Sequence, residues 1–259
     1  MNKLLDNIDK KPLFIIGPCV IESRELLETV AEELVRLRDL YELNIVFKSS
    51  FDKANRTSIN SYRGPGLEKG LAELDHIKNK YKLPVTTDIH EPYQAEAVKD
   101  VIDIIQIPAF LCRQTDLLVA AANTGKIVNV KKAQFLSGED MVYPVQKLQE
   151  AGNRQILLTE RGNMYGYNNL VVDFRNILTM KAHGAPVIMD CTHSVQKPGG
   201  GKGVTGGNRE YVPYMALAAK AFGANGYFFE VHPDPDNAKS DGPNMLYLKD
   251  LEKVINSLL

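Results

Sequence analysis

The sequence predicts an α/β protein that folds as a single-domain (β/α)8 TIM barrel. Short apolar runs alternate with longer amphipathic segments along the 259 residues, eight of each. A continuous apolar run is typical of a parallel strand that is buried on both faces. Eight strand–helix units in a chain of this length favour a closed barrel over an open doubly wound sheet. The first strand–helix turn, Gly-Pro-Cys at 17–19, lacks the G-x-G-x-x-G pattern of a dinucleotide-binding fold.

The predicted strands are short runs rich in isoleucine, valine and leucine, and the predicted helices show an amphipathic spacing. The strands cover residues 13–16, 45–48, 85–88, 104–107, 127–130, 156–159, 187–189 and 227–230. The helices begin near Ser23, Gly66, Pro92, Gln114, Glu139, Leu170 and Arg209, and the last covers residues 245–258. Because glycine accepts the left-handed conformation that ends many helices, we expect it to end four of them, at Gly125, Gly152, Gly184 and Gly223.

Composition is that of an ordinary globular protein, with 44% hydrophobic and 24% charged residues. A net charge of −1 argues against nucleic acid or an anionic membrane as the main partner. Three widely spaced cysteines do not suggest a disulfide framework, so we expect a reducing, cytoplasmic location. The segment 1–11 is too polar for a signal peptide. We expect one domain over residues 1–259 that includes this short polar segment.

Polar groups end or follow nearly every predicted strand. A TIM barrel gathers the carboxyl ends of its strands at one face, where its active site lies. Charged side chains are rarely buried without a partner, so we expect this ring of residues to serve one common site. The ring consists of Cys19, Lys48, Asp88, Gln106, Lys131, Lys132, Glu160, Arg161, His193, Glu230 and His232.

The cationic part of this ring extends into the segment 47–66, which has neither a helical nor a strand period. No matching carboxylates stand in the same loops, and this arrangement suits a substrate with two or more anionic groups. The alternative is a solvated rim of the barrel without a binding function. The cationic set consists of Lys48, Lys53, Arg56, Lys131 and Arg161.

A second subset combines the thiol of Cys19, the imidazole of His193 and the carboxylate of Glu230. Thiolate, imidazole and carboxylate are the ligands of a borderline-soft divalent ion such as zinc or ferrous iron. A strand-end cysteine is more often a small buried apolar side chain, and we interpret Cys112 and Cys191 in this way. Residue chemistry does not choose the fourth ligand among His232, Asp234, Asp236 and Asp241.

The segment 197–208, KPGGGKGVTGGN, holds six glycines and two lysines in twelve residues. Glycine of this density suits a mobile lid that closes over a substrate. The same composition also fits a disordered surface loop.

Eight stretches spread along the chain resemble those of one known family, the 3-deoxy-D-manno-octulosonate 8-phosphate synthases. The stretches are GPCVIES at 17, FKSSFDKANRTS at 47, TDIHEP at 87, IQIPAFLCRQTDL at 105, VNVKKAQF at 128, TERGNMYGYNNLVVDFR at 159, DCTHSVQ at 190 and FFEVHPDPDNAKSDGPN at 228. The resemblance runs from residue 14 to residue 259. Sister enzymes that use erythrose 4-phosphate carry a K-P-R-T/S form where this chain has KANRTS.

The resemblance implies a transferase that condenses phosphoenolpyruvate with arabinose 5-phosphate, a step of Kdo and lipopolysaccharide biosynthesis. In this family the pentose phosphate lies at the positions of Asn55, Arg56 and Thr57, the last of which is usually serine. Lys131 and Arg161 point toward the phosphate of phosphoenolpyruvate. The other expected substrate-binding residues are Lys48, Lys53, Asp88, Gln106 and Ala109.

A cysteine after Gly-Pro marks the metal-dependent members of this family, whereas asparagine marks the metal-independent ones. Cys19 therefore implies a divalent ion (Zn, Fe, Mn or Co) held by Cys19, His193, Glu230 and Asp241. The ion either polarises the sugar aldehyde or lowers the pKa of a bound water, and the sequence leaves both roles open. The expected catalytic residues are the ligands Cys19 and His193, together with Lys53 as a proton donor near the aldehyde oxygen.

The resemblance also implies a homotetramer in which the segment 47–66 reaches a neighbouring subunit's site.

Two rival functions remain. The first is an enzyme of the same superfamily that accepts erythrose 4-phosphate or an amino sugar, and the KANRTS stretch argues against it. The second is a barrel that binds sugar phosphates or scaffolds partners without turnover. A ring of unpaired cations argues against this second alternative.

Overall fold

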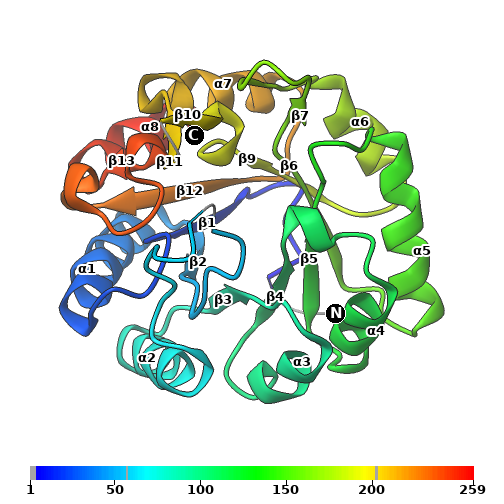
Figure 1. The fold of residues 1–259 in the computed structure, drawn as a ribbon, viewed down its shortest axis with the longest axis horizontal. Coiled ribbons are helices and arrows are strands. Elements are labelled where there is room, and N and C mark those ends of the chain that lie inside the picture. Colours follow the sequence, from blue (N-terminus) through cyan, green and yellow to red (C-terminus); the bar gives the residue numbers. More distant parts are fainter. Residues whose placement is uncertain (1–3, 57, 202–203) are drawn as a thin grey trace.

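The computed structural model describes residues 4–56, 58–201 and 204–259. Its centre is a closed barrel of eight parallel strands in the order β1-β2-β3-β4-β5-β6-β9-β12, with β12 paired back to β1 (Figure 1). The predicted TIM barrel is therefore confirmed. The barrel strands are β1 (Leu13–Gly17), β2 (Asn44–Lys48), β3 (Val85–Asp88), β4 (Ile104–Ile107), β5 (Ile127–Lys131), β6 (Ile156–Glu160), β9 (Val187–Asp190) and β12 (Gly226–His232).

In the described part of the chain, eight α-helices surround the barrel (Figure 1). The first begins where predicted, because the Ser23 hydroxyl accepts a hydrogen bond from the Leu26 backbone N–H at 3.2 Å and caps it. All four glycines that were expected to end helices have positive φ angles, between 68° and 90°. The helices are α1 (Arg24–Tyr41), α2 (Leu67–Tyr81), α3 (Pro92–Val98), α4 (Thr115–Asn123), α5 (Val142–Glu150), α6 (Arg175–Lys181), α7 (Val212–Ala221) and α8 (Leu251–Leu258).

Two predicted helices begin later than expected because strand pairing outweighs their local pattern. Helix α6 does not begin near Leu170, since β8 (Leu170–Val171) pairs with β7 (Asn163–Met164) in a short hairpin. Helix α8 does not begin at Met245, since β13 (Leu246–Tyr247) pairs with the end of β12.

The glycine-rich segment is also more regular than a plain loop. Its described part forms an antiparallel ribbon of β10 (Gln196–Gly201) and β11 (Val204–Gly207). Residues 202–203, in the centre of the expected lid, lie outside the described residues. Among the helices that are described, none has both the length and the apolar character needed to cross a bilayer.

Side chains alternate between two environments along each barrel strand. Outward-facing residues such as Ile105 and Val128 join the large core between the barrel and the helices. Inward-facing residues near the amino ends of the strands, such as Ile104 and Phe228, form a separate apolar cluster that Ile8 completes. The amino-terminal segment thus helps to close one end of the barrel. Polar residues occupy the inward positions near the other end, so the site has an apolar floor.

Candidate active site

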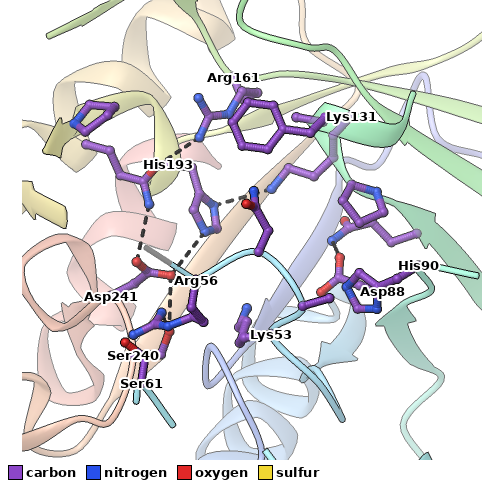
Figure 2. A pocket seen from close by; sticks show the side chains of 18 of the residues that line it. Lys53, Arg56, Ser61, Asp88, His90, Lys131, Arg161, His193, Ser240 and Asp241 are labelled. Carbon is purple, nitrogen blue, oxygen red and sulfur yellow. Dashed lines mark hydrogen bonds and ion pairs between the residues drawn. The ribbon is translucent and has the colours of Figure 1, made fainter. Parts of the chain in front are cut away.

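A cavity of about 1020 Å³ opens at the carboxyl ends of the barrel strands (Figure 2). Two further expected residues, Cys19 and Glu230, lie buried close to it. Thr57 lies outside the described residues. The expected residues that line the cavity are Lys48, Lys53, Asn55, Arg56, Asp88, Gln106, Ala109, Lys131, Arg161, His193 and Asp241.

The cations at the base of the cavity are paired, which corrects the expectation that they have no partners. The Lys48 Nζ atom lies 3.0 Å from Glu230 Oε1 and 3.7 Å from Asp88 Oδ2. Lys53 Nζ lies 3.8 Å from the same Glu230 oxygen. These carboxylates come from other strands, so the sequence of the loops that hold the lysines did not reveal the pairing. Pairing across the barrel keeps the buried charges in balance.

Asp88 accepts a hydrogen bond from the Gln106 amide in addition to its ion pair with Lys48. Its Oδ1 atom accepts a hydrogen bond from Gln106 Nε2 at 2.5 Å, and Gln106 Oε1 accepts one from Asn129 Nδ2 at 3.1 Å. Burial alone would raise the pKa of Asp88, but Lys48 and Lys53 outweigh it and hold the pKa well below its usual range. Asp88 is thus ionised at neutral pH, and the Gln106 side chain has one defined orientation.

Arg161 lines the cavity and has buried hydrogen-bond donors without a partner among the described residues. Only 5% of the residue is exposed, and its Nη2 atom donates to Gln196 Oε1 at 2.9 Å. The buried Nε and Nη1 atoms have no hydrogen-bond partner among the described residues. Arg161 and Lys131 both line the cavity, and Figure 2 shows them on the same side of it. A guanidinium and an ammonium that line one side of a cavity suit a phosphate, whose oxygens can accept from both.

Asp190 is a site residue that the sequence analysis missed. Its Oδ2 atom lies 2.7 Å from His193 Nδ1 and also pairs with the Lys131 ammonium. Burial would raise the pKa of Asp190, but His193 and Lys131 outweigh it and hold the pKa well below its usual range. The predicted strand ended at Met189. The available signal was alternation, because Asp190 is the next inward position after Ile188.

Four candidate metal ligands converge beside this network. The ligand atoms of Cys19, Glu230 and Asp241 all lie within 4.8 Å of one another. His193 Nε2 lies 3.4 Å from Glu230 Oε2 and 4.0 Å from Asp241 Oδ2. Asp190 holds the opposite ring nitrogen, so Nε2 faces the cluster, as is usual for a metal-binding histidine. Figure 2 shows His193 between the Lys131 side of the cavity and Asp241.

The protonation states of this cluster also suit a cation. Burial would raise the pKa of Glu230, but His193, Lys48 and other nearby cations lower it to about 2, so the carboxylate is ionised. Its buried Oε2 atom makes no hydrogen bond to any described residue. Burial, followed by the Glu230 charge, raises the pKa of the Cys19 thiol well above its usual value. A divalent ion would favour the thiolate, and the sulfur, nitrogen and oxygen donors fit such an ion.

The geometry favours Asp241 among the four candidates for the last ligand. Asp241 Oδ2 lies 3.1 Å from Cys19 Sγ. Asp236 instead contacts Arg209 at 2.6 Å and Tyr247 at 2.7 Å. The Asp234 carboxylate accepts a hydrogen bond from Asn237 Nδ2 at 2.7 Å, and His232 Nδ1 accepts one from the Asp234 backbone N–H at 3.0 Å. These three side chains therefore have other partners.

The segment 47–66 approaches the candidate metal ligands through Ser240. Arg56 Nη1 donates to Ser240 Oγ at 2.6 Å (Figure 2). Cys19 Sγ lies 3.2 Å from the same oxygen. Asn55 is exposed at the cavity mouth. The sequence analysis also missed Ser240 and His90 as cavity residues. Lys132, Glu160 and His232, which it placed in the same ring of strand ends, do not line the cavity.

Comparison with known proteins gives a consistent result. Residues 3–258 match the model of the DAHP synthetase I family. The chain is similar to the 2-dehydro-3-deoxyphosphooctonate aldolase of Cyanothece sp., with 55% identity over 252 residues that cover 97% of this chain and 92% of the relative. The enzyme of that name from Fusobacterium nucleatum is 56% identical over 246 residues, covering 95% and 88%. The one from Desulfatibacillum aliphaticivorans is 56% identical over 247 residues, covering 95% and 90%.

Proposed function

The chain belongs to the DAHP synthetase I family, and from its likeness to the 2-dehydro-3-deoxyphosphooctonate aldolases we infer that it is an enzyme of that activity. It condenses phosphoenolpyruvate with D-arabinose 5-phosphate and water, and it releases 3-deoxy-D-manno-octulosonate 8-phosphate and inorganic phosphate. The reaction is a transferase step of Kdo and lipopolysaccharide biosynthesis. The single observation that carries this conclusion is an identity above 50% over nearly the whole of both chains.

We place phosphoenolpyruvate across the cationic end of the cavity. Its phosphate lies against Arg161 and Lys131, and the unpaired Arg161 donors support this placement. Lys48, Lys53, Gln106 and the backbone at Ala109 hold the rest of the molecule, and Asp88 orients the Gln106 amide. Positioning of this kind brings C3 of phosphoenolpyruvate and the sugar aldehyde into contact before they react.

The pentose phosphate enters from the cavity mouth, with its phosphate at Arg56 and with Asn55 and Thr57 beside it. The bond forms between C3 of phosphoenolpyruvate and C1 of the sugar. Water adds at C2, and phosphate leaves with cleavage of the C–O bond. The surrounding cations stabilise the charge that develops during these steps. Burial would lower the pKa of Lys53, but Cys19, Glu230 and Asp88 outweigh it, so Lys53 remains protonated and can donate to the aldehyde oxygen.

We further propose that Cys19, His193, Glu230 and Asp241 hold one divalent ion (Zn, Fe, Mn or Co). The convergence of their donor atoms supports this ligand set, as does the buried Glu230 Oε2 atom, which makes no hydrogen bond to a described residue. When bound, such an ion supplies Lewis acidity, which acts either on an aldehyde oxygen or on a water. Asp190 orients the His193 ligand and holds Lys131 through the other contact of the same carboxylate.

An Asp190→Asn variant is expected to bind zinc about 10- to 100-fold more weakly, the range typical for loss of a partner behind a metal ligand. The amide can no longer hold His193 and Lys131 as an anion, so the KM for phosphoenolpyruvate should rise as well. Titration against a chromophoric chelator measures the zinc affinity. Asp173→Asn is the matched control, since Asp173 lies at the surface, where its ion-pair partner among the described residues is Arg175. Wild-type zinc affinity in Asp190→Asn would contradict the role of Asp190.

Phosphate release with two sugar phosphates separates the proposed activity from its rivals. The metal-loaded protein should release phosphate from phosphoenolpyruvate with arabinose 5-phosphate and much more slowly with erythrose 4-phosphate. Mass spectrometry should detect the eight-carbon product. Turnover with the tetrose phosphate alone would assign the sister activity. Binding of phosphoenolpyruvate in calorimetry without phosphate release for any acceptor would identify a non-catalytic barrel.

We also propose that the protein is a cytoplasmic homotetramer. None of its three cysteines, all of which lie in the described part of the chain, forms a disulfide. Several large apolar side chains are exposed on loops that follow the barrel strands. Phe135 and Tyr165 are more than half exposed, and Tyr165 stacks on Tyr167 at 6.4 Å between ring centroids. Exposed apolar surface next to the site is consistent with contacts between subunits.

A further inference from the structure

A fully buried ion pair, Lys132 and Glu160, lies next to the cavity but does not line it. Both residues are 0% exposed, and Lys132 Nζ lies 3.4 Å from Glu160 Oε1. We propose that this pair positions the backbone from which Lys131 and Arg161 reach the phosphate of phosphoenolpyruvate. This inference rests on the proposed function. It makes substrate affinity depend on two side chains that never touch the substrate.

Strand alternation explains why the pair lies outside the cavity. Lys131 faces inward at the end of β5, so its neighbour Lys132 faces outward. Glu160 ends β6 in the outward position, and Arg161 then returns to the cavity. Each phosphate-facing cation is thus the direct neighbour of one member of the buried pair.

Lys132 joins the two segments that follow β5 and β6, next to these cations. Its ammonium donates to two backbone carbonyls after β5, those of Ala133 at 3.3 Å and Leu136 at 3.1 Å. It also donates to the Gly162 carbonyl at 3.2 Å and to Asn163 Oδ1 at 2.9 Å, both after β6. One ammonium therefore connects the two segments. Burial lowers the pKa of Lys132, and the Glu160 charge opposes that effect.

Glu160 fixes the backbone of Arg161 directly. Its Oε1 atom accepts hydrogen bonds from the Arg161 N–H at 2.9 Å and the Gly162 N–H at 2.6 Å. The Arg161 guanidinium itself has one hydrogen bond within the described structure, to Gln196. Its place at the cavity consequently depends on its backbone. A planar guanidinium binds phosphate well only in the correct orientation, so a small backbone shift weakens binding.

The test compares Lys132→Met and Glu160→Gln with the wild type, all metal-loaded. Lys132→Met should weaken phosphoenolpyruvate binding about tenfold in calorimetry, while the KM for arabinose 5-phosphate stays within about twofold. Glu160→Gln keeps the shape and the acceptor oxygen but loses the charge, so it should show a smaller shift in the same direction. Glu160→Gln carries the test alone if Lys132→Met does not fold.

Lys78→Met is the matched control. Lys78 makes the same kind of link at the opposite end of the barrel, where its ammonium donates to the Val101 carbonyl at 2.7 Å and to Asp103 at 2.8 Å. This control should lower the midpoint of thermal unfolding without changing phosphoenolpyruvate affinity. Folded Glu160→Gln or Lys132→Met protein with wild-type affinity, whatever its thermal stability, would overturn the inference. Failure of the wild type to bind phosphoenolpyruvate would instead overturn the proposed function.

Discussion

A Cys19→Ser variant is expected to lose tight binding of the divalent ion and more than about 100-fold in kcat. Loss of a partner behind a metal ligand already costs 10- to 100-fold, and loss of a ligand costs more. Metal analysis after gel filtration and a phosphate-release assay measure the two effects. Cys112→Ser is the matched control, because Cys112 is equally buried but lies outside the cluster. A Cys19→Ser variant with full metal content and full activity would contradict the ligand assignment.

A Cys19→Asn variant tests what the proposed ion contributes to catalysis. The family resemblance implies asparagine at this position in metal-independent members, so the variant tests whether this chain can work without the proposed ion. Activity that survives in metal-free Cys19→Asn protein would mean that the ion mainly organises the site. Complete loss of activity in a folded variant, judged by circular dichroism, would mean that the ion takes part directly in the chemistry.

An Arg161→Met variant is expected to lose about 100- to 1000-fold in kcat/KM for phosphoenolpyruvate, the usual cost of removing one preorganised donor from a charged transition state. The kcat/KM of Arg161→Lys should lie between those of Arg161→Met and the wild type, because lysine keeps the charge but not the planar pair of donors. Arg154→Met is the matched control, since Arg154 is exposed at the amino end of the same strand. Steady-state kinetics with varied phosphoenolpyruvate measures the difference. Similar kcat/KM values for Arg161→Met and Arg154→Met would contradict the phosphate assignment.

The Arg161→Met variant should be at least as stable as the wild type. The Nε and Nη1 atoms of Arg161 are buried without a hydrogen-bond partner among the described residues, and each such donor costs about 1–3 kcal/mol. Methionine removes this cost, so the midpoint of thermal unfolding should stay equal or rise. A large fall in that midpoint would show that Arg161 serves mainly to hold the fold together.

The sequence was sufficient to predict the barrel because its strands and helices have strong local patterns. The predicted strand 104–107 matches β4 in both bounds, and α1 begins directly after its predicted cap, Ser23. Prediction failed where pairing with a neighbouring strand determines the secondary structure of a segment. The segment near Leu170 has helical spacing, but its backbone hydrogen bonds go to β7. Such pairing depends on the path of the chain in space and leaves no local periodicity.

The site could be predicted by residue type but not by its pairings. The polar strand ends marked Lys48 and Lys131 as site residues, and both line the cavity. Their partners Glu230 and Asp190 come from strands that are distant in the sequence, so only closure of the barrel reveals them. Inward and outward alternation would have separated Lys131 from Lys132. It would also have identified Asp190.

The most direct test of this account is phosphate release from phosphoenolpyruvate and arabinose 5-phosphate by protein stripped of metal and then titrated with single divalent ions. Stripping should abolish activity, and one equivalent of a suitable ion per chain should restore it. Activity should not return in the Cys19→Ser variant at the same ion concentration. Full turnover by stripped wild-type protein in the presence of excess chelator would contradict the account.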